Sequence, residues 1–542
     1  MNLDHLLARL SSAGLIESLD EPEKAYEFNH ALMQDSVYGS LLKSQRRDLH
    51  RAVAQAIERT FPKRRGKLSE VLAYHWELAQ VPDRARRYLF RAAQNATRQY
   101  ANQEALALLE RALAQSAGAS PEEMMALRES RAQIFEFLSR PDLAVEDYQA
   151  ALWLARQVNL PIDECRIMSR LAWLYSLNGK RAEAVAMAVE TETKAHALQD
   201  QAAALRAYLV EGLVAQAEGN LAYAYPRLRR ALFASRASDE RVMEGECLYY
   251  LGSEDEFMGR FGRAAASAGK AYEIKKGLSD HAGEITSLYL IARAEGGRGN
   301  YDAALQALEA GHAVADEIHN PFGRAQYPNT RAWLCAELGD WQSAHDYDVA
   351  GLAIARRAGV RPSEISTLIS LVLDCTALGE LSQADEHVGE LDRWMEHEEI
   401  GFYAWRWQIE LTEARARLEL ARACYDQADD LMRELLESAA HTGSTKYLAR
   451  GRLLRGQLHV ERKEFDAAEA DFVAACYLAD VMGYVPVRLQ ARRRLIELDE
   501  RNGTDAAPRR DEAARIIADL GQRLKDAGLR RSFQRGIAAS TR

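Results

Sequence analysis

The sequence predicts an all-α solenoid, a stack of helical hairpins with a period of about 40 residues. Glycine recurs at this spacing through the middle of the chain, and each of these glycines is followed five residues later by alanine. Seven residues before each glycine the side chain is again small or short. A fixed period of this size is typical of stacked identical units rather than of one central core. The glycines are Gly179, Gly219, Gly259, Gly299, Gly339 and Gly379.

The composition of one unit explains this spacing. Each glycine is expected to end a helix, because the chain there needs a positive φ, and the next helix begins within two residues. The alanine five positions on is small enough to let the second helix cross closely against the first. Aromatic side chains such as Phe261, Tyr301 and Trp341 are expected to fill the turn. Weaker copies of the pattern begin at Ser139, at Ala423 and at Lys463.

A small residue in the first helix, followed by Gly-x-aromatic-x-x-Ala at the turn, resembles the tetratricopeptide repeat. The resemblance covers roughly residues 65 to 500 and implies a right-handed superhelix of hairpins. The usual period of that repeat is 34, so each unit here is longer by about six residues, or roughly 9 Å of helix. Longer helices of this kind are similar to those of bacterial signalling ATPases and their regulators.

The N-terminal segment up to Thr60 does not follow the repeat. It predicts a helix that ends at Gly14, an extended segment at Tyr26 to Phe28 and then further helices, which is the layout of a winged-helix ending. The segment from Phe28 to His50 resembles the end of the ATPase module in bacterial STAND-type proteins, the signal-transduction ATPases with numerous domains. The resemblance implies three regions: a winged-helix-like remnant with a connecting helix at 1–62, a tetratricopeptide solenoid at 63–503, and a C-terminal capping helix and tail at 504–542.

Catalytic motifs are missing from the sequence. A phosphate-binding loop needs the pattern GxxxxGK[ST], which does not occur, and neither GxSxG nor HExxH is present. We therefore expect a protein that is not an enzyme and holds no cofactor. The STAND resemblance implies that the nucleotide-binding domain is missing here and is encoded upstream.

His30 is the one residue to which the resemblance gives a nucleotide-related role. Winged-helix domains of this ATPase class often place a histidine near the phosphates of bound ADP, and the position of His30 in FNHAL matches that pattern. An imidazole can donate a hydrogen bond to a phosphate oxygen. The alternative is that His30 caps the helix that starts beside it or packs under the wing.

Metal sites are not expected. His312 and His319 are seven residues apart on one predicted helix with Asp316 between them, but this half-site is incomplete without a ligand from a neighbouring helix. The cysteines are scattered, with no CxxC and no metal-ligand spacing. Cys335 and Cys375 take the same place in successive repeats, which suits a small buried side chain.

Binding is the function that stacked hairpins support, because the first helix of each unit lines a continuous inner groove. In this repeat class the groove positions stand at fixed offsets before the turn glycine. An aromatic side chain there is a good binding anchor, since it offers much contact area with few rotatable bonds. The alternative is that the longer helices rotate these side chains into packing between helices. The candidate residues are Trp173, Glu246, Tyr249, Glu256, Phe257, Tyr289, Arg293, Gln326, Asn329, Trp333 and Glu337.

A second aromatic cluster, Phe402, Tyr403, Trp405 and Trp407, lies where the repeat shifts its register by four residues. It either fills a wider angle between hairpins or exposes a patch to a partner.

Charge and hydropathy restrict the class of partner. The net charge is −10, no apolar stretch is long enough to span a membrane, and the first ten residues include Asp4, His5 and Arg9 instead of an apolar signal core. We expect a cytoplasmic protein that binds no membrane, and nucleic acid is an unfavourable partner for so acidic a chain.

Two functions follow from this reading of the sequence. The first is the tetratricopeptide sensor and scaffold part of a STAND-type signalling protein, with a protein or peptide ligand in the groove and an ATPase domain as a further partner. The alternative is a free-standing adaptor that assembles a protein complex.

Overall fold

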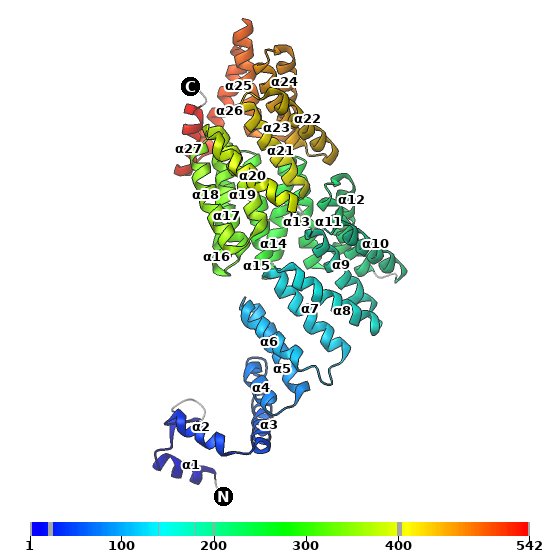
Figure 1. The fold of residues 1–542 in the computed structure, drawn as a ribbon, viewed down its shortest axis with the longest axis vertical. Helices are drawn as coiled ribbons and strands as arrows, with labels where there is room; N and C mark the ends of the chain where they lie inside the picture. The colour runs from blue at the N-terminus through cyan, green and yellow to red at the C-terminus, as the bar shows by residue number, and fades with distance from the viewer. Residues whose placement is uncertain are drawn as a thin grey trace. The chain divides into compact units, whose positions relative to one another are not determined.

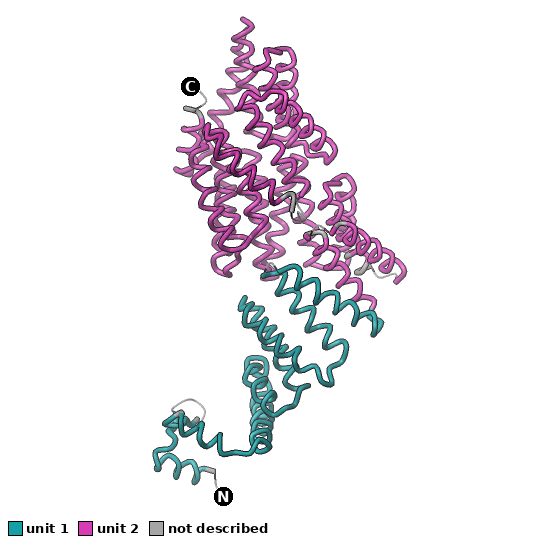
Figure 2. Tube along the Cα trace, viewed as in Figure 1, with its two compact units in different colours: residues 1–160 teal, residues 161–542 magenta. Residues whose placement is uncertain are grey.

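The computed structural model describes residues 3–19, 25–138, 140–178, 180–198, 201–397 and 404–539. Most of these residues are α-helical, and consecutive helices pack as antiparallel hairpins (Figure 1). The predicted all-α, tetratricopeptide-like solenoid is thereby confirmed. The chain divides into two compact units, residues 1–160 and residues 161–542 (Figure 2). The domain boundaries predicted after residues 62 and 503 lie inside these units and stay predictions.

Unit 1 begins with a helix, a two-stranded hairpin and two further helices. The strands are antiparallel, with Ile16 opposite Phe28, and Asn29 Nδ2 donates a hydrogen bond to the carbonyl oxygen of Gly14 (2.8 Å). The predicted helix end at Gly14 and the predicted extended segment are both present, while the assignment to a winged helix stays a prediction. The elements are α1 (Leu3–Ser12), β1 (Ile16–Leu19), β2 (Ala25–Phe28), α2 (Ala31–Ser40) and α3 (Lys43–Thr60).

The hairpins of unit 1 follow directly. A hydrogen-bonded chain links this part to the first helices, because the Tyr38 hydroxyl pairs with His50 Nε2 (2.9 Å) and His50 Nδ1 pairs with His75 Nδ1 (2.9 Å). Burial lowers the pKa of both histidines, which favours the neutral rings that such a pair requires. The helices are α4 (Ser69–Leu78), α5 (Pro82–Arg98), α6 (Asn102–Ala114), α7 (Pro121–Phe137) and α8 (Pro141–Gln157).

Unit 2 is itself an array of helical hairpins. Its first helices are α9 (Pro161–Leu177), α10 (Arg181–Ala197), α11 (Gln201–Ala217), α12 (Leu221–Ala237), α13 (Arg241–Phe257), α14 (Phe261–Gly277), α15 (His281–Gly297), α16 (Tyr301–Glu317), α17 (Pro321–Glu337) and α18 (Trp341–Ala358). They are followed by α19 (Arg361–Leu378), α20 (Leu381–His397), α21 (Ala404–Ala421), α22 (Tyr425–Thr442), α23 (Thr445–Glu461), α24 (Phe465–Met482), α25 (Val485–Asn502), α26 (Ala507–Arg523) and α27 (Ala527–Ala539).

Each repeat contains two turns, and the glycine series marks only one of them. Most helices here are 17 residues long, and the short connections between them contain a residue in the left-handed conformation. The predicted turn glycines have φ between 74° and 82° wherever they are described. Three of the alternate turns use Asp239, Ser279 and His319 and the fourth uses Gly359, which lies outside the 40-residue glycine series. From residue 219 to 379 the left-handed residues are Gly219, Asp239, Gly259, Ser279, Gly299, His319, Gly339, Gly359 and Gly379.

The predicted close crossing of the two helices of a hairpin is confirmed. Ala264 is fully buried, and a Cβ atom added to Gly252 would lie 3.2 Å from the carbonyl oxygen of Ala264. A Cβ atom at Gly456 would lie 2.5 Å from the ring of Phe472. The backbones therefore approach too closely for a larger residue at these positions.

The turn glycines of unit 2 also contact helices much later in the chain. A Cβ atom at Gly219 would meet Trp405, and one at Gly259 would meet Met482. A Cβ atom at Gly339 would lie 2.9 Å from Cα of Gly536, on α27. In an open solenoid each repeat contacts only its neighbours. Here the C-terminal helices lie along the turns of the central hairpins, so unit 2 closes on itself.

Among the described helices, none combines the length and the apolar character that crossing a membrane requires.

Candidate functional site

The first helices of three consecutive hairpins, α13, α15 and α17, present most of the predicted groove positions to one inner surface of unit 2. These side chains line three cavities. The helices have equal length and equal spacing, so the same offsets from the turn select the same face in each repeat. The predicted residues that line the cavities are Tyr249, Phe257, Tyr289, Arg293, Gln326, Asn329, Trp333 and Glu337.

The three cavities form a continuous strip. Their volumes are about 90, 100 and 80 Å³. The first two share Arg293, Gln326 and Arg406 in their walls, and the second and third share Trp333 and Arg450. Each has room for several water molecules, since about 10–15 Å³ of such space holds one. The residues around these cavities are called the inner row below.

The opposite wall of the inner row comes from the C-terminal hairpins, on α21, α23 and the turn before α25. Lys446 Nζ donates a hydrogen bond to Glu256 Oε1 (2.8 Å), and Arg293 Nη2 donates to Glu256 Oε2 (2.8 Å). The Tyr484 hydroxyl donates to Glu337 Oε1 (3.0 Å). Two predicted groove residues, Glu256 and Glu337, thus hold parts of the same chain that lie far away in sequence.

The charges of this wall are buried in opposite pairs. Burial alone would raise the pKa of Glu256, but the nearby cations of Arg293 and Lys446 lower it to about 2. Burial would likewise raise the pKa of Glu413, and the charge of Arg450 brings it below its usual value. Both carboxylates are therefore ionised at neutral pH. Removing one partner of such a pair leaves an uncompensated buried charge.

The aromatic residues near the register shift are packed. Trp405 meets Phe257 edge to face, with ring centroids 5.1 Å apart, and its Nε1 donates to the carbonyl oxygen of Gln216 (2.8 Å). Trp407 Nε1 donates to Ser366 Oγ (3.0 Å). Of the two interpretations of this cluster, packing holds for Trp405 and Trp407, which are both buried. The other two members, Phe402 and Tyr403, lie outside the described residues.

Trp333 both packs and lines the inner row. Its ring covers Gly296, where a Cβ atom would come within 2.7 Å, and its Nε1 donates to Glu337 Oε1 (2.9 Å). Trp173 takes the equivalent position four repeats earlier. It packs instead against Tyr250, with ring centroids 5.6 Å apart. Trp173 lines none of the three cavities.

Glu246, the remaining predicted groove residue, lies outside the inner row. Its carboxylate forms an ion pair with Lys275 Nζ (2.9 Å), and the same ammonium lies 4.9 Å from the centroid of the Tyr249 ring. This contact lies within one hairpin, between α13 and α14.

The charged residues of the facing wall were missed by the sequence analysis, although the same rule selects several of them. Ala423 and Lys463 take the left-handed conformation that the glycines take elsewhere, with φ of 60° and 63°. The groove offsets of 13, 10 and 6 residues, counted back from Ala423, select Glu410, Glu413 and Arg417. The offset of 13 residues, counted back from Lys463, selects Arg450. The sequence identifies the weaker repeats at Ala423 and Lys463, and the groove positions above apply the same offsets to them.

A buried carboxyl pair lies at one end of the inner row. Asp348 and Asp374 both line the third cavity and are almost fully buried. Asn329 Nδ2 donates to Asp348 Oδ1 (2.9 Å). Burial raises the pKa of Asp348, and it raises that of Asp374 to about 8, so this pair holds a proton at neutral pH.

The predicted nucleotide and metal candidates lie elsewhere. His30 is exposed at the N-cap position of α2, and its side chain makes no capping hydrogen bond. His312 lies 3.4 Å from Asp316, but Arg324 Nε also donates to this carboxylate (2.7 Å). The Arg324 guanidinium also contacts His319 Nδ1 (3.0 Å), so a cation already occupies the proposed half-site.

A separate hollow in unit 1 is lined by basic side chains. Its volume is about 900 Å³, and its wall includes Lys63, Lys67, Arg87, Arg91 and Arg98. The cluster at 63 to 67 connects α3 to α4 and is largely exposed, as expected for a solvated connection.

Comparison with known proteins supports the fold. No family model matches the chain, and no curated protein sequence matches it. A Rap protein solved in complex with competence and sporulation factor is 13% identical, with a TM-score of 0.50 over 67% of this chain and 99% of that chain. A STAND protein with a tetratricopeptide repeat sensor from Pyrococcus horikoshii is 14% identical, with a TM-score of 0.37 over 80% of this chain and 61% of that chain. A Rap conjugation gene regulator in complex with the Phr* peptide is 13% identical, with a TM-score of 0.41 over 66% of this chain and 95% of that chain. The likeness to the Rap protein, with its TM-score of 0.50, shows a shared fold and no more.

Proposed function

We propose that the chain is a non-catalytic sensor that binds a protein or peptide segment along the inner row of unit 2. The observation that carries the proposal is the inner row itself, a continuous strip of cavities between two walls of polar and aromatic side chains. Ligand sites combine apolar and aromatic side chains with a few polar groups that fix orientation, and the strip offers both kinds of side chain.

The polar groups of the strip suit an extended backbone. Gln326 Nε2 makes only long contacts, 3.4 Å to Asn329 Oδ1 and 3.3 Å to Thr330 Oγ1. Contacts of this length are weak and are easily exchanged for shorter ones. A peptide backbone offers both donors and acceptors, so it can take over these bonds while the Trp333 ring packs against a side chain.

The fold of the Rap protein is compatible with this proposal, because that protein was solved with a bound factor. We extend the proposal to the sensor part of a STAND-type signalling protein. In that setting the N-terminal helices of unit 1 face a nucleotide-binding domain, and the exposed His30 imidazole donates to a phosphate of bound ADP.

The binding proposal is tested with the full chain purified from its own cells. Mass spectrometry identifies the peptides or proteins that remain bound, and calorimetry then measures their affinity for single variants. Trp333→Ala and Gln326→Ala are each expected to bind the identified ligand at least about 10-fold more weakly. This corresponds to a loss of about 1.4 kcal/mol in binding free energy. The control is Tyr477→Ala, which removes an exposed aromatic side chain from α24. A Trp333→Ala variant that melts early but binds normally, together with normal binding by Gln326→Ala, would show that the strip only packs.

The STAND proposal has its own test. The chain is joined to a nucleotide-binding domain encoded next to it, and ADP retention is measured for the native sequence and for His30→Ala. We expect faster ADP release from the variant. Equal retention removes the nucleotide role of His30 and leaves the binding proposal untouched.

A further inference from the structure

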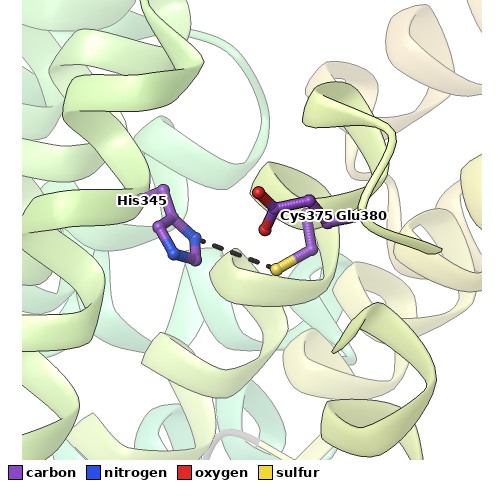
Figure 3. A group of neighbouring side chains, drawn as sticks. All are labelled: His345, Cys375 and Glu380. Atoms are coloured by element: carbon purple, nitrogen blue, oxygen red, sulfur yellow. Dashed lines mark hydrogen bonds between the residues drawn. The ribbon is translucent and has the colours of Figure 1, made fainter. Parts of the chain in front are cut away.

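Three side chains from consecutive helices converge on one point at the junction of α18, α19 and α20 (Figure 3). His345 comes from α18, Cys375 from the last turn of α19, and Glu380 from the residue just before α20. The His345 Nδ1 and Cys375 Sγ atoms are 3.8 Å apart. One ligand atom from each of the three residues lies within 4.8 Å of those of the other two.

These distances match a small tetrahedral ion. Zinc binds nitrogen at about 2.0–2.1 Å and thiolate sulfur at about 2.3 Å, so two such ligands on a tetrahedral centre lie about 3.6 Å apart. The imidazole and thiol are already at nearly that separation. The Glu380 side chain is exposed and has rotatable bonds with which to complete the approach. The thiol is fully buried, the imidazole is half-buried and the carboxylate is exposed, so an ion can enter from the solvent side.

The repeat pattern shows that hairpin packing does not require a histidine here. His345 follows the crossing alanine Ala344, and the same position in the preceding repeats holds Tyr225, Ala265 and Leu305. In the preceding repeat Cys335 takes the place of Cys375, and it contacts Ser532 Oγ (3.9 Å). The third position there is Asp340, whose carboxylate accepts the backbone N–H of Ser343 in the α18 cap.

We propose that His345, Cys375 and Glu380 bind one zinc ion, with water in the fourth position. Thiolate and imidazole ligands favour zinc over magnesium and calcium, which prefer oxygen ligands alone. On binding, the Cys375 thiol loses its proton to water as the zinc–sulfur bond forms, and no electron is transferred. The ion joins α18, α19 and α20, and it therefore fixes the second helix of one hairpin to both helices of the next.

The sequence analysis missed this site because its ligands are not close in sequence. His345 and Cys375 are 30 residues apart, and Glu380 is needed to complete the set. Such a spacing matches no zinc motif, and it produces a site only after consecutive helices have packed. The inference does not depend on a ligand in the inner row.

The test uses the full chain without a metal-binding tag. The protein is stripped with a chelator, incubated with zinc chloride, desalted and analysed for metal by mass spectrometry. We expect about one zinc per native chain, and almost none in Cys375→Ser or in His345→Leu. The leucine variant copies the residue of the preceding repeat, Leu305, so it is expected to fold. Cys335→Ser is the matched control, because it removes the equivalent buried thiol and is expected to keep the zinc.

Cobalt gives an independent readout, because a thiolate bound to Co²⁺ produces a charge-transfer band that an oxygen-bound ion lacks. The native chain and Cys335→Ser are expected to show this band and Cys375→Ser to lose it. The proposal is overturned if the native chain retains no zinc, or if folded His345→Leu and Cys375→Ser retain as much zinc as the native chain. It is also overturned if Cys335→Ser loses zinc to the same extent as Cys375→Ser.

Discussion

Glu254 is the most completely buried carboxyl group on α13. Its side chain is fully inaccessible, and neither oxygen has a hydrogen-bond partner among the described residues. Burial, aided by the charge of Asp255, raises its pKa to about 9. The folded state therefore holds the proton more tightly than the unfolded state. The stability this gives is complete below the unfolded pKa and is lost as the pH rises from about 4.5 towards 9.

The Glu254→Gln variant is expected to unfold at a higher urea concentration than the native chain at pH 8. Glutamine has the shape of the protonated acid but never ionises, so the difference in free energy of unfolding grows by up to about 1.4 kcal/mol per pH unit. Unfolding is measured at pH 6, 7 and 8. The control is Glu273→Gln, at an exposed position on α14. If the two variants show the same pH dependence, Glu254 is not neutral in the folded chain.

The groove positions of individual residues could be predicted because the resemblance supplies their offsets from the turn and the regular helices repeat them. Tyr249 and Tyr289 stand at the same offset before their turn glycines, and Trp333 stands about one helical turn closer to its own, so all three lie on one face. Their burial could not be predicted in the same way. Lys446, which contacts Glu256, lies 190 residues further along the chain, and no local pattern records a contact over that separation.

At the level of the element, the sequence revealed every second turn of the central array. Glycine occupies the turn inside each hairpin, and its positive φ was predicted correctly. Three of the turns between hairpins use Asp239, Ser279 and His319, with φ of 55°, 56° and 54°, while a fourth uses Gly359. Left-handed geometry is strained for most residues but is tolerated by polar ones such as aspartate and histidine. The turns without glycine were therefore invisible to a search for glycine.

Two turn glycines separate the effect of backbone strain from the effect of close packing. Gly339 and Gly379 have nearly equal φ, 82° and 80°. Among the described residues other than its chain neighbours, a Cβ atom at Gly379 would meet nothing within 4 Å, whereas one at Gly339 would press against Gly536. Gly379→Ala is expected to lower the free energy of unfolding by about 1–2 kcal/mol, because of backbone strain alone. Gly339→Ala is expected to lower the free energy of unfolding further, because the added methyl group also clashes with Gly536 on α27.

Thermal unfolding of both variants measures this difference, and hydrogen exchange along α27 shows where it arises. Faster exchange over residues 527–539 is expected only in Gly339→Ala. Equal losses of stability, with unchanged exchange in α27, would mean that the approach of the two glycines is not tight in solution.

At the level of the whole molecule, the closure of unit 2 depends on contacts between its central and C-terminal hairpins. The ion pair of Glu256 with Lys446 is deeply buried, since these residues are only 1% and 6% exposed. The apolar pair of Phe257 and Trp405 lies beside it. The resemblance to known families predicted the stack of hairpins, but neither the resemblance nor the period predicted that the stack would close.

The Lys446→Met variant is expected to lower the free energy of unfolding by about 3 kcal/mol, because it leaves a carboxylate buried with one cation fewer. The double variant Lys446→Met/Glu256→Gln is expected to recover part of this loss. Arg433→Met is the control, because the pair of Arg433 with Asp430 is exposed and such pairs contribute at most about 1 kcal/mol. Urea unfolding measures these three variants and the single variant Glu256→Gln. A double variant that is less stable than Lys446→Met by the full cost of Glu256→Gln would show that the two residues act independently.

The contacts of the turn glycines with the C-terminal helices also determine how this array folds. An open repeat protein can nucleate in any pair of repeats and grow outwards, and its ends can fray independently. Unit 2 cannot complete the packing around Gly339 until Gly536, on the last described helix, has arrived. Such distant contacts raise the contact order above that of an open array of hairpins, which slows folding. During synthesis, the central hairpins would therefore remain incompletely packed until α27 has been synthesised.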